Sequence, residues 1–339
     1  MNMQGLKGLC FGQEELPKEV LDWIAQQNLW NLWVPRCYGG LELSLTEGLE
    51  KLKELARIDG SLGWTVTLCS GANFFIGNLQ KEVAAEIFMN GKKPIFGGSG
   101  GVFGTADRQG NGYVVSGKWK YATGARYLTH FTLNAKIREE GREVLTDDGV
   151  PLVRSFVLER DDVEICRDWD TMGLRATTTE SFTVESQWVD GRYTFLYDEL
   201  HQPHLIFKVP FSAFADLTLW VNYIGMAQHF LEEAQNIVGP EPTLNKLLSF
   251  TASAAQLANE LAQRVEQLVH SGKQVPEEME LEIHQEASES VRLLSGAMIG
   301  AYPLLGIRAS SMQNPLNQIF RDYFTATQHH IFSAGGKRS

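Results

Sequence analysis

The chain has 339 residues, of which 43% are hydrophobic, and its formal net charge at pH 7 is −11. This length and apolar content can bury a large core and predict two or three domains. The negative charge argues against a nucleic-acid surface, which needs a basic stripe. The four cysteines are widely spaced and form no CxxC pattern, so we expect a reducing compartment, no disulfide framework and no metal site. No segment approaches the ~20 apolar residues that cross a bilayer, and we therefore expect a cytoplasmic protein without membrane contact.

Residues 1–93 have the periodicity of helices. Pro17 is suited to a helix start, and apolar residues follow it at helical spacing. Pro35 and the Gly39-Gly40 pair interrupt the pattern. Three further helices are expected to begin near Thr46, Ser61 and Lys81.

Residues 94–195 have a different pattern, with frequent glycine and short runs that are typical of strands. The turn signals Gly110-Asn111-Gly112 and 146–149 separate some of these runs. The segment therefore predicts a compact antiparallel sheet or barrel, with a β-barrel as our preferred interpretation. The predicted strands include 113–116, 130–133, 155–158 and 181–184.

Residues 196–339 return to long helical periodicity. Breaks at Gly239-Pro240, Ser271-Gly272 and Pro303 divide the segment, which predicts a four-helix bundle. The whole chain is thus expected to be an α+β protein with three domains, 1–93, 94–195 and 196–339. The four predicted helices are Phe211–Val238, Pro242–His270, Pro276–Ala301 and Pro315 to about Ser333.

Five short motifs lie in the same order as in a known family. In this order and over this architecture, they resemble the acyl-CoA dehydrogenase superfamily across nearly the whole length. The resemblance implies a flavoprotein whose helical bundle assembles as a homotetramer or homodimer. The motifs are Val34-Pro35-Arg36-Cys37-Tyr38-Gly39-Gly40, Asp59-Gly60-Ser61-Leu62-Gly63-Trp64, the segment 116–124 (SGKWKYATG), Met172-Gly173-Leu174-Arg175, and Asn314-Pro315 through Arg321-Asp322.

The residues after Arg321-Asp322 distinguish two branches of this family. Many of its dehydrogenases carry a glutamate here, and in register that position is His330. The absence of this carboxylate is more similar to the flavin-dependent monooxygenase branch, whose C-terminal histidine falls on His329. The resemblance then implies reduced FMN or FAD, supplied by a separate flavin reductase, and hydroxylation of an aromatic or heteroatom-containing small molecule. Arg321-Asp322 itself is interpreted as an ion pair that organises the last helix.

His329 is the candidate catalytic base, because an imidazole with a pKa near ~6.5 can deprotonate a phenol or amine at working pH. The alternative is a histidine that caps helix carbonyls or meets the helix dipole. On an ideal helix His330 points some ~100° away from His329, so we assign it a structural role.

Ser99, Tyr121, Thr123, Gly124 and Arg175 are the candidate flavin-binding residues. The Thr123 hydroxyl and the backbone around it, including Gly124, can hydrogen-bond the polar edge of a flavin. The resemblance places Tyr121 against the ring, although a core position is the alternative. Ser99 lies in a glycine-rich segment that suits backbone contacts with a flavin. Arg175 can hold a phosphate or form an interdomain ion pair.

Two other functions remain open from the sequence. The chain can be an acyl-CoA dehydrogenase or oxidase with a relocated base, for which Asp216 on the first bundle helix is the candidate. It can also be a non-catalytic homologue that binds flavin or another ligand.

Overall fold

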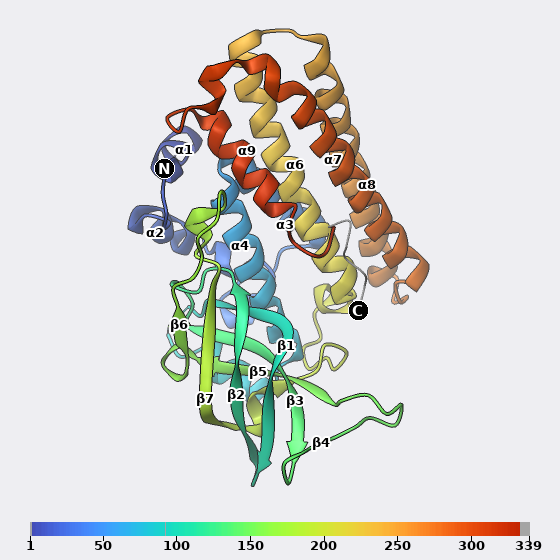
Figure 1. The fold of residues 1–339 in the computed structure, drawn as a ribbon. Coiled ribbons are helices and arrows are strands. Elements are labelled where there is room, and N and C mark those ends of the chain that lie inside the picture. Colours follow the sequence, from blue (N-terminus) through green and yellow to red (C-terminus); the bar gives the residue numbers. More distant parts are fainter. Residues whose placement is uncertain (1, 92, 333–339) are drawn as a thin grey trace.

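A mixed β-sheet occupies one end of the molecule and long helices occupy the other, in a computed structural model that describes residues 2–91 and 93–332 (Figure 1). The helix α4 runs between these two regions. It contacts strand β1 and helices α3, α6 and α9, and is apolar around most of its circumference. This burial on several sides makes α4 the central element of the fold.

The N-terminal helices begin where the sequence provides caps. Ser44 and Glu47 form a reciprocal capping box at the start of α3. Asp59 ends α3 and caps α4, because its Oδ1 accepts a hydrogen bond from the Leu62 amide at 2.9 Å. The helices are α1 (Met3–Cys10), α2 (Lys18–Gln26), α3 (Leu45–Ile58), α4 (Gly60–Asn73) and α5 (Lys81–Phe88).

The sheet has the strand order β6-β7-β2-β1-β3-β5-β8, and β4 pairs with β3. This order forms an open path among the described residues, so the expected closed barrel is not present. The antiparallel prediction also fails at the centre, where β1 and β3 are parallel, because the chain crosses from β2 to the far edge of β1. The strands are β1 (Phe96–Gln109), β2 (Gly112–Ala122), β3 (His130–Glu139), β4 (Arg142–Glu143), β5 (Val153–Glu159), β6 (Glu164–Cys166), β7 (Glu180–Asp190) and β8 (Thr194–Phe195).

The glycine-rich segment that contains Ser99 forms the first half of β1. A Cβ at Gly98 would lie 1.8 Å from the Thr132 carbonyl oxygen, so the parallel approach of β3 requires glycine there. The pairing of β1 with β3 shifts register between Ser99 and Val102. This irregularity interrupts the regular hydrogen-bond pairing of β1 with β3 just after Ser99.

The C-terminal helices are α6 (Phe211–Val238), α7 (Pro242–His270), α8 (Glu277–Ala301) and α9 (Pro315–Ala326). Helices α6, α7 and α8 contact one another, while α9 and the N-terminal α3 contact α6. No described helix combines the length and apolar character needed to cross a bilayer. Short 3-10 helices occur at 29–31, 36–38, 74–78, 160–162, 175–177, 191–193, 205–208, 302–305 and 307–310.

Helix α9 is shorter than predicted. It ends at Ala326, whose carbonyl accepts a hydrogen bond from the Tyr223 hydroxyl at 2.6 Å. The His329 amide bonds the same carbonyl at 2.9 Å, and this closes a turn instead of continuing the helix. The predicted end at Ser333 lies outside the described residues.

Candidate functional site

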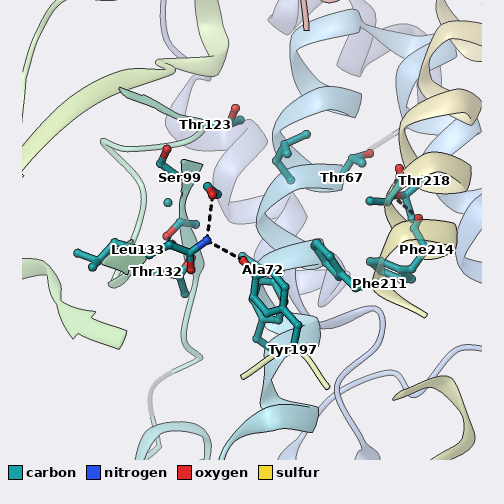
Figure 2. A pocket seen from close by; sticks show the side chains of 18 of the residues that line it. Thr67, Ala72, Ser99, Thr123, Thr132, Leu133, Tyr197, Phe211, Phe214 and Thr218 are labelled. Carbon is teal, nitrogen blue, oxygen red and sulfur yellow. Dashed lines mark hydrogen bonds between the residues drawn. The ribbon is translucent and has the colours of Figure 1, made fainter. Parts of the chain in front are cut away.

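A cavity of about 160 Å³ lies between α4, α6 and the central strands of the sheet (Figure 2). One side is aromatic and is formed by Phe75, Phe211, Phe214 and Tyr197. The opposite side carries the hydroxyls of Ser99 and Thr123 and the backbone of residues 97–100. Apolar walls with a few placed polar groups are typical of small-molecule sites.

The aromatic wall is held by ring stacking. The rings of Phe75 and Tyr197 are nearly parallel, at 5° and 5.0 Å between centroids. Phe211 lies 5.1 Å from Tyr197, and Phe214 stacks at 4.2 Å on Phe74 behind it. Such a wall offers flat apolar surface to a planar ligand.

Asn134 connects the two sides of the cavity. Its Nδ2 donates to the Gly100 carbonyl at 2.9 Å and to the Tyr197 hydroxyl at 3.3 Å. Its Oδ1 accepts a hydrogen bond from Ser155 at 2.6 Å. The amide therefore fixes the position of Tyr197 relative to the glycine-rich part of β1.

Three of the five predicted flavin-binding residues, Ser99, Tyr121 and Thr123, line this cavity. Tyr121 has a φ of +68° and is 67% exposed, because a register shift in β2 between Trp119 and Ala122 turns its side chain outward. Trp119 is fully buried and donates to the Asn134 carbonyl at 2.9 Å, as expected for a core residue.

Gly124 and Arg175 do not line the cavity. The Gly124 amide donates to the Thr177 carbonyl at 2.8 Å. Its φ is +76°, and a Cβ would lie 2.8 Å from the Cys69 Sγ, so this turn requires glycine. The Arg175 guanidinium forms an ion pair with Glu14, which corresponds to the structural alternative for this residue.

Arg321 and Asp322 do not pair with each other, and this corrects the interpretation of the motif as an ion pair. Arg321 donates to the Met172 carbonyl and, at 2.9 Å, to Asn317 Oδ1. Asp322 Oδ1 accepts a hydrogen bond from the Leu174 amide at 2.6 Å. Both side chains of α9 therefore hold the segment 172–174, because each forms a hydrogen bond with a backbone group there.

Asp322 is a buried carboxyl next to a second buried acid. Burial, and then repulsion from Asp59, raises the pKa of Asp322 to about 8. Burial also raises the pKa of Asp59, whose Oδ2 accepts a hydrogen bond from Gln318 at 2.8 Å. The other oxygen of Asp322, Oδ2, has no partner among the described residues, which favours a proton on this acid.

His329 lies in the turn after α9 and does not line the cavity. Its ring contacts Trp64 at 5.7 Å, and Trp64 lies one turn of α4 before the cavity residue Thr67. Burial lowers the pKa of His329 to about 4, so its imidazole is neutral at pH 7. Its Nδ1 accepts a hydrogen bond from the Ile331 amide at 3.4 Å, which leaves the proton on Nε2.

The ideal-helix geometry that we assumed for His329 and His330 is wrong. Their ring centroids are 4.6 Å apart with an angle of 35° between the ring planes. The prediction assumed a continuous helix, whereas both residues lie in the turn after Ala326.

Asp216 faces α8 and not the cavity. Its buried carboxylate contacts the His284 Nδ1 at 3.2 Å, whereas its neighbours Ala215, Thr218 and Leu219 line the cavity. A carboxylate in this orientation is not positioned to act on a ligand in the cavity.

The site also contains residues that the sequence did not reveal. Asn134 comes from β3 and Tyr197 from the segment after β8, while the phenylalanines of the aromatic wall come from α6 and the 3-10 helix 74–78. An asparagine within the apolar run of β3 was the available signal, because a buried amide needs partners.

Comparisons with known proteins agree with this architecture. Residues 247–334 match the family described as acyl-CoA dehydrogenase, C-terminal domain. The indole-3-acetate monooxygenase of Pseudomonas putida is 26% identical over 94% of this chain and 84% of its own length. Over most of its length the chain is thus similar to flavin-dependent monooxygenases, and its C-terminal part is similar to acyl-CoA dehydrogenases. The sequence-based recognition is therefore confirmed.

Solved structures of low identity show the same fold. The HsaA monooxygenase of M. tuberculosis has a TM-score of 0.87 and 18% identity, with 97% of this chain and 90% of that chain covered. XiaF from Streptomyces sp., solved in complex with FADH2 and glycerol, has a TM-score of 0.86 and 20% identity, with 98% and 89% covered. The α+β fold class is thereby confirmed.

Proposed function

We propose that this protein is a flavin-dependent monooxygenase that uses reduced FMN or FAD and O2 to hydroxylate a planar aromatic or heteroatom-containing small molecule. The observation that carries the proposal is the cavity, in which a stacked aromatic wall faces hydroxyl and backbone groups. This arrangement fits a flavin, whose ring is flat and apolar with one polar edge. When bound, reduced flavin supplies the electrons that activate dioxygen. Relatives that cover 94% of the chain support the same function.

The residues of the cavity have distinct proposed roles. Ser99 and Thr123 hydrogen-bond the polar edge of the flavin, and Tyr121 covers the ring. Gly124 permits the turn that positions Thr123. Its amide is not free to bind the flavin, because it donates a hydrogen bond to the Thr177 carbonyl. Arg175 would bind a flavin phosphate only after exchanging its present partner Glu14.

The wider setting follows from the same proposal. A separate flavin reductase supplies the reduced cofactor, and the protein acts in the cytoplasm. The three segments 1–93, 94–195 and 196–339 are its proposed domains, with the sheet closing one side of the site and the C-terminal bundle the other. We further propose a homotetramer or homodimer, assembled through the bundle.

His329 is the proposed base, and its substitution tests the function. We predict that His329→Ala still binds reduced flavin and consumes oxygen but forms product at least ~100-fold more slowly, the lower range for general base catalysis. Oxygen uptake and product formation would be measured together with a chemical panel of phenols, indoles and sulfides. His330→Ala is the matched control and should retain coupling. Unchanged product formation by His329→Ala would remove His329 from the mechanism.

The same protein preparation can distinguish the proposed monooxygenase from an acyl-CoA dehydrogenase or oxidase. The contact between Asp216 and His284 places this acid away from the cavity, which disfavours its use as a relocated base. We expect that acyl-CoA thioesters leave the absorbance of protein-bound oxidised flavin unchanged. Rapid bleaching would instead favour a dehydrogenase, and failure to bind either form of flavin would favour a non-catalytic homologue.

A further inference from the structure

Behind Thr123, three threonine hydroxyls form a continuous hydrogen-bonded chain, here called the threonine relay (Thr123, Thr179 and Thr177). The Oγ1 atoms of Thr123 and Thr179 are 3.1 Å apart, and those of Thr179 and Thr177 are 2.7 Å apart. Thr177 Oγ1 then forms a hydrogen bond of 2.7 Å with the Leu174 carbonyl oxygen. All three threonines are buried, and only Thr123 lines the cavity.

The direction of each hydrogen bond in the relay follows from counting hydrogens. A hydroxyl has one hydrogen and a carbonyl has none, so Thr177 must donate its hydrogen to Leu174. The contact at 2.7 Å between Thr177 and Thr179 therefore uses the hydrogen of Thr179. Thr179 has no second hydrogen, and its contact with Thr123 uses the hydrogen of Thr123. Thr123 consequently presents only lone pairs to the cavity.

The end of the relay is anchored, which keeps this direction fixed. The Leu174 carbonyl accepts the hydrogen bond from Thr177. The Leu174 amide donates a hydrogen bond to Asp322 Oδ1 at 2.6 Å. Leu174 and Thr178 both adopt left-handed backbone conformations, with φ of +51° and +43°. Residues other than glycine hold such conformations only where their surroundings impose them. The acceptor at the end of the relay is therefore part of a constrained segment tied to α9.

We propose that the threonine relay makes Thr123 an obligatory hydrogen-bond acceptor and thereby biases the site towards reduced flavin. This inference rests on the proposed function. Reduction changes the flavin N5 from a hydrogen-bond acceptor into an N–H donor, while the ring carbonyls remain acceptors and N3–H remains a donor. An acceptor-only hydroxyl would accept a hydrogen bond from N5–H of a reduced flavin in the cavity, and it would have no hydrogen to offer to the N5 lone pair of an oxidised flavin. Thr177 and Thr179 are thus positioning residues that select an oxidation state without touching the cofactor.

Two substitutions interrupt the relay at different points. Thr179→Val removes the group that accepts the hydrogen of Thr123. Thr177→Val removes the acceptor used by Thr179, whose hydrogen can then turn to Thr123. Either change frees Thr123 to donate into the cavity, and oxidised flavin should gain one hydrogen bond. Thr179→Ser and Thr177→Ser keep each hydroxyl and are the matched controls.

The experiment measures the dissociation constants of oxidised and anaerobically reduced FMN and FAD for the full-length protein and these variants, with thermal unfolding to confirm folding. We expect wild type to bind reduced flavin more tightly. Each valine variant should tighten oxidised binding about 5- to 10-fold, the effect of one hydrogen bond, and leave reduced binding unchanged. The serine variants should match wild type.

The outcomes separate the two proposals. Wild-type protein that binds neither flavin form overturns the proposed function and the inference with it. Wild-type protein that binds flavin, but whose ratio of oxidised to reduced affinity is unchanged in every folded valine variant, overturns the relay and leaves the function intact. A shift in Thr177→Val without one in Thr179→Val also contradicts the relay, because Thr177 reaches Thr123 only through Thr179.

Discussion

At the scale of single residues, the surroundings of a side chain decide which proton it carries. His329 was selected because a free imidazole titrates near pH 7, yet its contact with Trp64 and its burial keep the ring neutral. The bond from the Ile331 amide to Nδ1 also assigns the proton to Nε2. In this arrangement the Nε2–H group can donate a hydrogen bond, and the ring acts as a base only when the Ile331 amide releases Nδ1.

This state of His329 predicts the absence of a titration near neutral pH. Because burial lowers the pKa of His329 to about 4, its ring signals in a histidine-resolved NMR spectrum should not shift between about pH 5.5 and 8. Comparison with the His329→Gln spectrum assigns the signal. A midpoint near ~6.5, the value of an unperturbed imidazole, would show that the ring is solvated and not buried against Trp64.

The sequence predicted cavity residues where a motif marked them and missed those that only the fold brings together. Tyr121 and Thr123 belong to the motif 116–124, Ser99 lies in the glycine-rich segment, and all three line the cavity. Asn134 and Tyr197 are 63 residues apart in the sequence. Their hydrogen bond forms only because the fold brings β3 next to the segment after β8. The proton state of His329 could not be predicted either, because burial is a tertiary property.

At the scale of elements, the helices were predictable because their ends are marked. The bounds of α6 and α7 agree with the predicted ones, since proline and glycine stand at their ends. Strand β1 was missed because glycine weakens the pattern of a strand. Its glycines reflect close backbone approach, as at Gly98 beside Thr132, and such an approach is not visible in one sequence.

Close approach also governs how α3 meets α6. A Cβ at Gly225 of α6 would lie 2.4 Å from the Lys53 carbonyl oxygen and 2.8 Å from the Ala56 Cβ. We therefore predict that Gly225→Ala lowers the free energy of unfolding by about 1–3 kcal/mol, the usual cost of overpacking a core. Gly296→Ala in α8, where no atom lies within 4 Å of the new Cβ, is the matched control. Denaturant unfolding should show it unchanged or stabilised by up to about 1 kcal/mol; equal losses in both variants would contradict the packing argument.

At the scale of the whole molecule, α9 links the helical end to the sheet. Arg321 and Asp322 hold the segment 172–174, whose Leu174 carbonyl receives the threonine relay that ends at the cavity. A Cβ at Gly173 would lie 2.2 Å from the Arg321 carbonyl, so this junction is tightly packed. Two motifs that are far apart in sequence, 172–175 and 321–322, thus form one contact, which accounts for their presence together.

This junction makes the stability of the whole molecule depend on pH. The pKa of Asp322 is raised from 3.8 to about 8 by burial and by Asp59, so the folded state binds the proton more tightly than the unfolded chain. Stability from this acid is therefore complete below the unfolded pKa and is lost as pH rises towards about 8.

Asp322→Asn keeps an oxygen for the Leu174 amide and removes the ionisation. Between about pH 5 and 8 the free energy of unfolding should fall in wild type. We predict that this fall is about 1–3 kcal/mol smaller in the variant. Urea unfolding across this range would measure the difference, with the exposed Asp148→Asn as the control for net charge. Parallel curves for wild type and Asp322→Asn would show that the proton on this buried acid does not stabilise the junction between α9 and the sheet.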